Sequence, residues 1–520
     1  MTRRRTWAAA ALLTGAALVA GAPAEAASTV KVALKADIRS INPGVNRDDN
    51  TDAVMLHVVE GLVAYGEDAL VKPLLAGSVD VSADGLTYTF KLRKGVRFHN
   101  GAELTAADVL WNWQRYTDPR TDWRCLPEVD GRNGLKVLSV TAPDEHTVVM
   151  TINKPSALFL DTLARTDCAM TGILHRDSLN ADGSFKEPIG TGPYRFAEWR
   201  RGEYVRVTRF DAYANRGGPR DGYTGGKAPL VEEVRFVVIP DSSTAKAALL
   251  RGDIDLIPDL GNSDVAEVKA SPKVNVDVSI TTGLVTLLMQ TRDPLLSNVK
   301  LRQAIAAAID TPQIVAAVTD GLGKPNNSVV PTPSAYYTPV QAKGYSFDPA
   351  RAKKLVAEAG YKGEPIVMLA NKRYPSSFDS AVVAQAMLQA VGLNVTIEVL
   401  EWATQLDRYQ KGNYQMMAFP YSGRLDPALS FESVSGPKDK QPRKVWDNTY
   451  AQALIEKAMV ISDRAERQKI FDELHRHFIA DAPMIMLYNT VTAAAFSRRL
   501  EGYVSGIAAK PRLWEVRLAD

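Results

Sequence analysis

Two apolar runs on either side of a helical stretch constrain the fold of this 520-residue chain more than any other feature. Residues 366–369 and residues 394–400 both have the composition of buried strands. Residues 380–391 between them form a helical pattern that ends at Gly392. Since parallel strands need a long crossover connection, this order predicts a parallel α/β unit.

A hairpin is predicted closer to the N-terminus. Residues 79–82 form its first strand, Asp84-Gly85 its turn and residues 86–92 its second strand, in which apolar and polar residues alternate. The alternation indicates a strand that is buried on one face. Similar patterns predict strands at 29–36, 234–239 and 484–488, and helices at 52–63, 106–116, 242–251, 299–308, 311–319 and 464–480.

The first 26 residues have the order of a secretory signal. Three arginines, Arg3 to Arg5, precede an uncharged apolar run over residues 7–20, and a small-x-small site follows at residues 24–26. The run is shorter than the roughly 20 residues that span a bilayer. We expect cleavage after Ala26, although cleavage after Ala24 or Ala27 is also compatible with the pattern.

Composition excludes several classes of protein. The 62 Lys and Arg residues nearly balance the 59 Asp and Glu residues, which argues against a nucleic-acid binder. Six scattered histidines and two cysteines predict no metal site. In an oxidising compartment the two cysteines, Cys125 and Cys168, could form a disulfide or remain separate buried thiols, and their spacing does not decide between the two.

The chain lacks the sequence signatures of common catalytic sites. It has no phosphate-binding Walker loop, no G-x-S-x-G nucleophile elbow and no H-E-x-x-H metal helix. His475 and His477 are two positions apart on a predicted helix, so they point to different faces. We therefore expect an exported binding protein without catalytic residues, cofactor or metal. A secreted hydrolase is the alternative.

Several blocks, in order along the chain, resemble one family. They are 41–43, 60–63, 73–78, 84–101, 104–109, 190–194, 239–243, 248–255, 301–305, 348–355 and 482–485. The chain is thereby identified as resembling the family 5 extracellular solute-binding proteins of ATP-driven importers, which include dipeptide-, oligopeptide- and nickel-binding proteins.

The resemblance implies an α/β, two-lobed periplasmic binding protein fold of class II, the large cluster C type. Two strands connect the lobes, and the first lobe carries an extra subdomain. The expected division is a signal peptide at 1–26; lobe one at 28–72 with 190–282 and 491–520; the extra subdomain at 73–189; and lobe two at 283–490.

Candidate ligand-binding residues follow from matches to family segments that face the cleft between the lobes. Arg373 lies just beyond a predicted strand, where relatives place an arginine that meets a peptide carboxylate. Trp402 follows the next strand and is either a core residue or a platform for ligand. Asp167, with Arg165, lies where some relatives contact ligand.

The loop at residues 420–427 matches a family loop with one residue fewer. Tyr421 could stack on a ligand or pack within the lobe. Arg424 stands where peptide binders have an acidic residue for the ligand ammonium. If the shorter loop shifts the match, Asp426 becomes the ammonium partner and Arg424 points to solvent; otherwise Asp426 only stabilises a turn.

The resemblance implies a monomeric periplasmic solute-binding subunit that closes around its ligand and docks on a membrane permease with ATPases. Peptides or peptide-like solutes are the expected ligands. An oligosaccharide or a metal chelate is the alternative ligand class.

Overall fold

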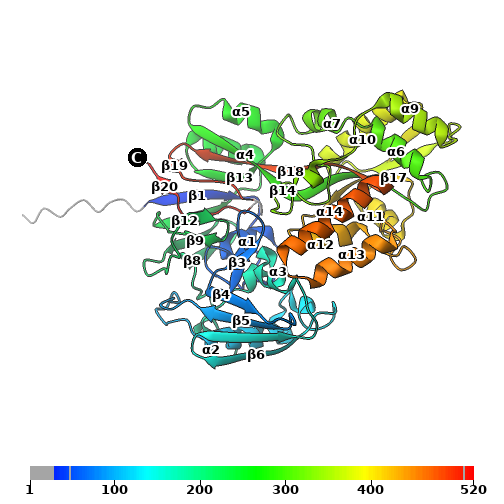
Figure 1. Cartoon of the computed structure of the whole chain (residues 1–520). Helices are drawn as coiled ribbons and strands as arrows, with labels where there is room; N and C mark the ends of the chain where they lie inside the picture. Colours follow the sequence, from blue (N-terminus) through cyan, green and yellow to red (C-terminus); the bar gives the residue numbers. More distant parts are fainter. Residues whose placement is uncertain (1–27, 46–47, 507–509, 520) are drawn as a thin grey trace, which may run out of the picture.

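The computed structural model describes residues 28–45, 48–506 and 510–519, so the predicted signal peptide lies outside the described residues. One mixed sheet of ten strands runs through both lobes (Figure 1). Its strands, in spatial order, are β16 (Val395–Val399), β15 (Ile366–Ala370), β17 (Met416–Tyr421), β14 (Val274–Met289), β18 (Met484–Ser497), β13 (Leu256–Leu260), β1 (Thr29–Leu34), β12 (Glu233–Val238), β9 (Tyr204–Arg209) and β8 (Tyr194–Arg200).

The predicted parallel α/β unit is confirmed in lobe two. Strand β15 pairs in parallel with both β16 and β17, and α10 (Pro375–Ala390) crosses between β15 and β16. Alternate residues of β15 enter different cores, Ile366 and Met368 on one face and Leu369 on the other. Burial on both faces explains why the strand is a continuous apolar run. The other helices of this lobe are α6 (Val299–Ala308), α7 (Thr311–Val318), α8 (Pro339–Ala342), α9 (Pro349–Glu358), α11 (Trp402–Lys411), α12 (Pro427–Val434), α13 (Thr449–Val460) and α14 (Arg464–Asp481).

In lobe one, β1 pairs in parallel with β12, from Thr29 opposite Glu233 to Leu34 opposite Val238. Asp241 caps the following helix, and Gly252 ends it in a left-handed conformation at φ 87°. The helices here are α1 (Asp49–Met55), α4 (Ser242–Arg251) and α5 (Val265–Lys269), and the short strand pairs are β2 (Val63–Tyr65) with β3 (Val71–Pro73), β10 (Arg220–Asp221) with β11 (Thr224–Gly225), and β19 (Leu500–Glu501) with β20 (Arg517–Leu518).

The extra subdomain is a separate four-stranded antiparallel sheet with its own apolar core. The predicted hairpin is its β4–β5 pair, and Thr105 opens α2 with a capping box that includes Asp108. A disulfide joins Cys125 to Cys168, which decides between the two states that the sequence left open. The elements are β4 (Ala76–Val81), β5 (Thr87–Leu92), α2 (Ala106–Thr117), β6 (Val137–Asp144), β7 (Thr147–Ile152) and α3 (Phe159–Ala164), followed by the 3-10 turn η3 (Thr166–Thr171).

Two long neighbouring strands, β14 and β18, pass from one lobe into the other (Figure 1). They pair in antiparallel fashion, and their register shifts between Ile280 and Leu284. The predicted boundaries of lobe two, 283 and 490, fall inside these strands. A change of register at this place interrupts the ladder where the chain has to bend between the lobes.

The helix predicted at 52–63 ends at Met55 instead. Beyond it the backbone bonds to a distant segment, because His57 and Val58 carbonyls accept hydrogen bonds from Tyr194 and Gly192. Tertiary hydrogen bonds here replace those that a longer helix would form.

In the described residues, no helix is both long enough and apolar enough to cross a bilayer.

Candidate ligand-binding site

A cavity of about 1650 Å³ lies between the lobes and the extra subdomain. Its lining comes from β1, α1, β13 and α4 of lobe one, from the α3–η3 region of the extra subdomain, and from the loop after β17 and part of α13 in lobe two. Residues 281–283 of β14 and Thr490 of β18 also line it, so the crossing strands belong to the wall. A ligand here would contact both lobes and the segment between them.

The hinge segment, which we define as residues 281–283 of β14 with Thr490 of β18, is in close contact with the lobe-two loop. The hydroxyls of Thr281 and Thr490 lie 2.6 Å apart across the two crossing strands. Gly423 packs so closely on this segment that a Cβ atom there would lie 1.9 Å from Oγ1 of Thr282. A side chain at position 423 would therefore require Thr282 or the loop to shift. The loop at 421–426 thus packs directly on the hinge segment.

Tyr421 ends β17 and lines the cavity while it also packs against its own lobe. Its hydroxyl lies 3.2 Å from that of Tyr409, and its ring meets Phe419 edge-on at 5.1 Å. Burial raises the pKa of Tyr421 well above its usual value. The Tyr421 side chain thus packs within lobe two and also faces the cavity, so its position is compatible with both of the roles that the sequence left open.

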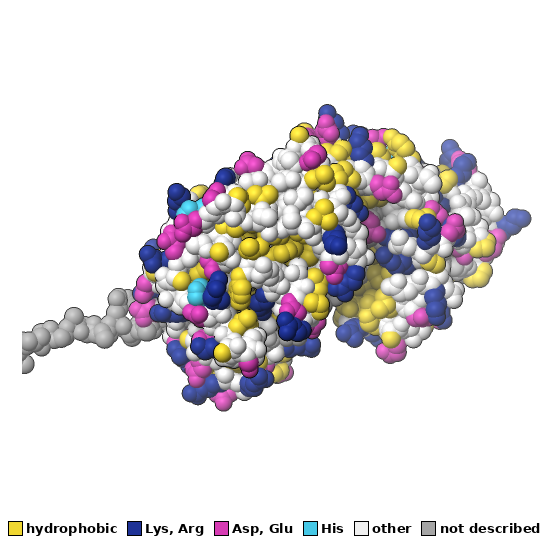
Figure 2. Space-filling view, turned by 90° about the horizontal axis from the view of Figure 1, so that it is seen from below, with side chains coloured by type: hydrophobic (Ala, Val, Ile, Leu, Met, Phe, Trp, Pro, Cys, Tyr) yellow, Lys and Arg dark blue, Asp and Glu magenta, His cyan; other side chains and the backbone are white. Residues whose placement is uncertain are grey.

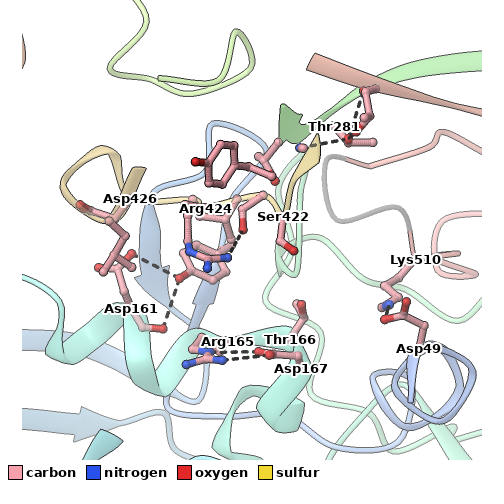
Figure 3. Close-up of a pocket in the computed structure, with 18 of the residues that line it drawn as sticks. Asp49, Asp161, Arg165, Thr166, Asp167, Thr281, Ser422, Arg424, Asp426 and Lys510 are labelled. Atoms are coloured by element: carbon pink, nitrogen blue, oxygen red, sulfur yellow. Dashed lines mark hydrogen bonds and ion pairs between the residues drawn. The ribbon is translucent and has the colours of Figure 1, made fainter. Parts of the chain in front are cut away.

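Arg424 and Asp426 both line the cavity but lie in different surroundings (Figure 3). Arg424 is exposed and donates to the Gly423 carbonyl at 3.2 Å. Asp426 is buried, caps α12 through the Ala428 N–H at 2.8 Å and forms a two-bonded ion pair with Arg467. Its carboxylate therefore already has a cationic partner within lobe two.

The wall of the extra subdomain carries four linked charges, which we call the charged cluster: Arg124, Glu128, Arg165 and Asp167. Both arginines donate to the Asp167 carboxylate, Arg124 at 2.8 Å and Arg165 at 3.0 and 2.9 Å. Arg165 also pairs with Glu128 at 3.3 Å. The cluster has formal charges of both signs and no net charge.

Asp161 of α3 is a second acidic residue at this wall, close to the loop that carries Asp426 (Figure 3). Burial and the nearby Asp426 raise the pKa of Asp161 to about 8, whereas Arg467 acts in the opposite direction. The Tyr65 hydroxyl donates to its carboxylate at 3.3 Å. A carboxylate of lobe two thus raises the pKa of a carboxyl group on the facing wall of the cavity.

Arg373 and Trp402 do not line this cavity. Arg373 is exposed in the turn before α10, and Trp402 packs against Tyr374 and Phe419 at ring distances of 4.9 and 5.6 Å. Both residues follow β15 or β16, which lie at the outer edge of the sheet, away from the crossing strands. The rule that ligands bind beyond strand ends does not tell which strands are central.

Sequence reasoning missed several charged residues of the cavity. Three of them belong to the extra subdomain, namely Asp161, Arg124 and Glu128. The ion pair of Asp49 with Lys510 was missed as well. Figure 3 shows this ion pair apart from the other labelled charges. No local pattern marks these residues. Of residues 28–45, 48–506 and 510–519, no three His, Cys, Asp or Glu side chains are grouped so that they could hold a metal ion.

Comparison with known proteins agrees with this architecture. The family description "Bacterial extracellular solute-binding proteins, family 5 Middle" matches residues 71–441. The chain belongs to this family. It is a solute-binding protein with the two-lobed fold, as the resemblance predicted, and the match includes the extra subdomain and most of lobe two.

Curated relatives of this family 5 protein differ in their ligands. Heme-binding protein A of Haemophilus influenzae is 29% identical over 466 residues, 84% of this chain and 82% of the relative. Glutathione-binding protein GsiB of Pectobacterium atrosepticum is 27% identical over 515 residues, 97% and 96% of the two chains. Oligopeptide-binding protein AppA of Bacillus subtilis is 28% identical over 486 residues, 88% and 85%.

Solved structures show the same fold. HbpA2 from Haemophilus parasuis aligns with a TM-score of 0.82 at 26% identity, over 95% of this chain and all of the other. The periplasmic binding protein DppA from Helicobacter pylori, in complex with the peptide STSA, aligns with a TM-score of 0.68 at 26% identity, over 95% and 98%.

Proposed function

We propose that this chain is the periplasmic receptor of an ATP-driven importer and holds a peptide or peptide-like solute between its lobes. The observation that carries the proposal is the cavity of about 1650 Å³ with walls from both lobes and the crossing strands. A site between two bodies that share a hinge binds by closure, because a ligand that contacts both lobes stabilises the closed arrangement.

The chemistry of the cavity supports this ligand class. Its volume exceeds the 300–1,000 Å³ that is usual for drug-sized ligands. Cationic and anionic side chains are interspersed along the walls. In Figure 3, Arg424, Arg165 and Asp167 lie on one side, and Asp49 with Lys510 lies on another. Such walls suit a solute that carries both an ammonium and a carboxylate group. Relatives named for peptides and glutathione support the same class.

The protein performs no chemistry of its own in this proposal. It is exported by cleavage of residues 1–26, works as a monomer, and delivers its ligand to a permease with ATPase subunits. The lobe boundaries given above divide it at the crossing strands. Figure 2 shows acidic and basic side chains intermixed on one face of the molecule.

Mass spectrometry of the solute that copurifies after mild lysis tests the proposal. We expect short peptides or peptide-like molecules, released by denaturation and rebound by the refolded protein in calorimetric titration. Heme, an oligosaccharide or a metal chelate as the copurified, rebinding ligand would overturn the proposed ligand class. N-terminal sequencing of the exported protein tests cleavage near Ala26.

Small-angle scattering tests closure. The protein stripped of ligand and the same protein saturated with the rebinding solute are compared, and we expect a smaller radius of gyration in the bound form. An unchanged radius at saturation would contradict binding by hinge closure.

A further inference from the structure

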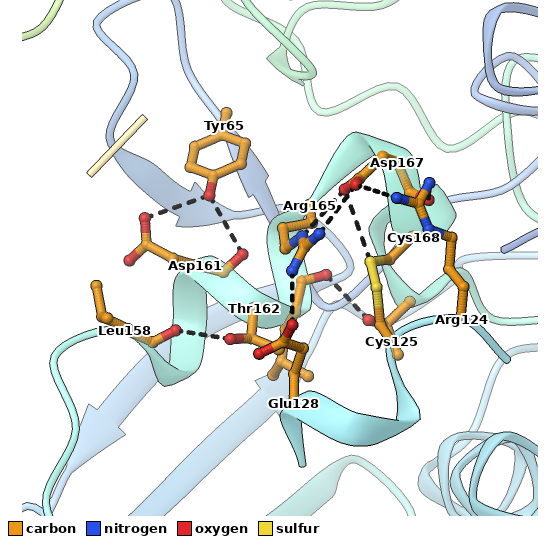
Figure 4. Close-up of a disulfide and its surroundings, with 12 residues drawn as sticks. Tyr65, Arg124, Cys125, Glu128, Leu158, Asp161, Thr162, Arg165, Asp167 and Cys168 are labelled. Carbon is orange, nitrogen blue, oxygen red and sulfur yellow. Dashed lines mark hydrogen bonds and ion pairs between the residues drawn. A yellow bond between two sulfur atoms is a disulfide. The ribbon is translucent and has the colours of Figure 1, made fainter. Parts of the chain in front are cut away.

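The disulfide lies directly behind the charged cluster (Figure 4). Cys125 and Cys168 are buried, with exposures of 1% and 0%. The residues that immediately precede them, Arg124 and Asp167, line the cavity and pair with each other. Besides the side-chain pair, Arg124 donates to the Asp167 backbone carbonyl at 2.9 Å. One covalent bond thus fixes the two chain segments that carry this pair.

The segment after Cys168 has an unfavourable backbone. Ala169, Met170 and Thr171 have φ angles of 51°, 55° and 48°, in the left-handed region that side chains with a Cβ atom disfavour. A run of three such residues persists only where surrounding contacts impose it. One of the contacts that hold this segment is covalent, namely the disulfide from Cys168 to Cys125.

Noncovalent contacts hold the other end of this turn. The Met170 N–H donates to the Arg165 carbonyl at 2.8 Å, and the Thr171 hydroxyl donates to the Leu163 carbonyl at 3.1 Å. Gly61 allows the Met170 carbonyl to approach, because a Cβ atom at position 61 would lie 1.9 Å from that oxygen. The turn therefore fixes Arg165 and Asp167 of the charged cluster through its own backbone.

We propose that the Cys125–Cys168 disulfide is a positioning element of the ligand site. It holds the backbone of Arg124 against that of Asp167, so that the charged cluster presents its two cations and two anions in a fixed order to a zwitterionic ligand. The form without the disulfide binds ligand more weakly. This inference rests on the proposed function, and it fits an oxidising compartment, where a disulfide persists.

The test compares the wild type with the Cys125→Ala/Cys168→Ala variant in hydrogen exchange and in binding. The probes are trialanine, tetra-alanine and S-methylglutathione, which has no free thiol. We expect amide exchange across residues 165–171 to become about tenfold faster or more, as local opening becomes easier. We also expect the dissociation constant of a probe that binds the wild type to rise about tenfold, because small displacements of binding groups are costly.

A matched control separates positioning from general destabilisation. Val148→Ala removes apolar volume from the fully buried β7 position in the core of the same subdomain, away from the cavity wall. It should lower the melting temperature while it leaves the exchange at 165–171 and the probe affinity near wild-type values. Binding is measured at a temperature where circular dichroism shows all variants folded.

Arg124→Gln adds a double-mutant cycle. If the disulfide acts by positioning Arg124, the losses of affinity from Arg124→Gln and from removal of both cysteines are not additive. Additive losses, or unchanged exchange at 165–171, would overturn the inference. If the wild type binds none of the probes, the proposed peptide class fails, and the exchange comparison still decides whether the disulfide holds the cluster in place.

Discussion

Both carboxylate oxygens of Asp426 accept hydrogen bonds from Arg467, each at 2.8 Å. The two side chains come from different helical segments of lobe two and are 4% and 5% exposed. Asp426 also caps α12. This pair fixes the C-terminal end of the loop that begins at Tyr421. Arg424 therefore lies between two fixed points, the ion pair at Asp426 and the contact of Gly423 with Thr282 in the hinge segment.

Removal of one partner from this pair should destabilise the protein. Arg467→Met leaves the Asp426 carboxylate buried without its cation, which typically costs about 3–5 kcal/mol in free energy of unfolding. Urea denaturation measures the loss, and Arg464→Met, at an exposed position of the same helix, is the control. A loss below about 1 kcal/mol, the value of a surface pair, would contradict the structural role of Asp426.

Arg424 should determine which charged group the ligand presents at this loop. An arginine in a closed cleft repels an ammonium group and favours an anionic or polar one. We expect Arg424→Asp to weaken binding of N-blocked peptides and to strengthen binding of free ones, with little change in stability because the side chain is exposed. Calorimetric titration with matched free and N-acetylated peptides measures this. Tight binding of free dipeptides by the wild type, unchanged in the variant, would contradict it.

Gly423→Ala should uncouple the loop from the hinge. The new Cβ atom would lie 1.9 Å from the Thr282 hydroxyl and 3.0 Å from a backbone atom, so the loop has to move. We expect an affinity about tenfold lower, because the ligand-facing loop is displaced. Gly77→Ala is the matched control, since its Cβ atom would meet its nearest neighbour at an ordinary 3.5 Å. Equal affinities for both variants would contradict the coupling.

Asp161 should contribute stability that is lost as the pH rises toward about 8. Burial, followed by the charge of Asp426, raises the pKa of Asp161 to about 8. In the unfolded chain an aspartate has a pKa of about 3.9, so the folded state binds the extra proton. The associated stability is complete below pH 4 and is lost as the pH rises through 8.

Burial also raises the pKa of Asp52 to about 7, with the same sign of pH dependence. Thermal unfolding of the wild type and of Asp161→Asn at several pH values between 5 and 9 measures the effect. The variant should show a shallower decline, with the contribution of Asp52 remaining. Parallel curves for the two proteins would contradict the assignment to Asp161.

Local patterns in the sequence predicted most of the helices and strands named above, and the ordered sequence blocks identified the family. Three of these patterns depend only on residues that are close in sequence: the apolar run at 366–369, the alternation at 86–92 and the helix cap at Thr105. They therefore predict local structure without knowledge of the segments that pack against them. The helix predicted over 52–63 is the instructive failure. Hydrogen bonds to residues near 192, more than 130 positions away, replace its second half.

Only the tertiary structure decided which charges meet. The sequence placed Arg424, Tyr421 and Asp167 among the candidates, and all three line the cavity. It also offered Arg373 and Trp402, which follow strands at the sheet edge, and it could not connect Asp426 with Arg467 or Arg124 with Asp167. Ion pairs between segments 40 or more residues apart depend on strand order and on the lobe arrangement, and these arise from long-range packing that no local window contains.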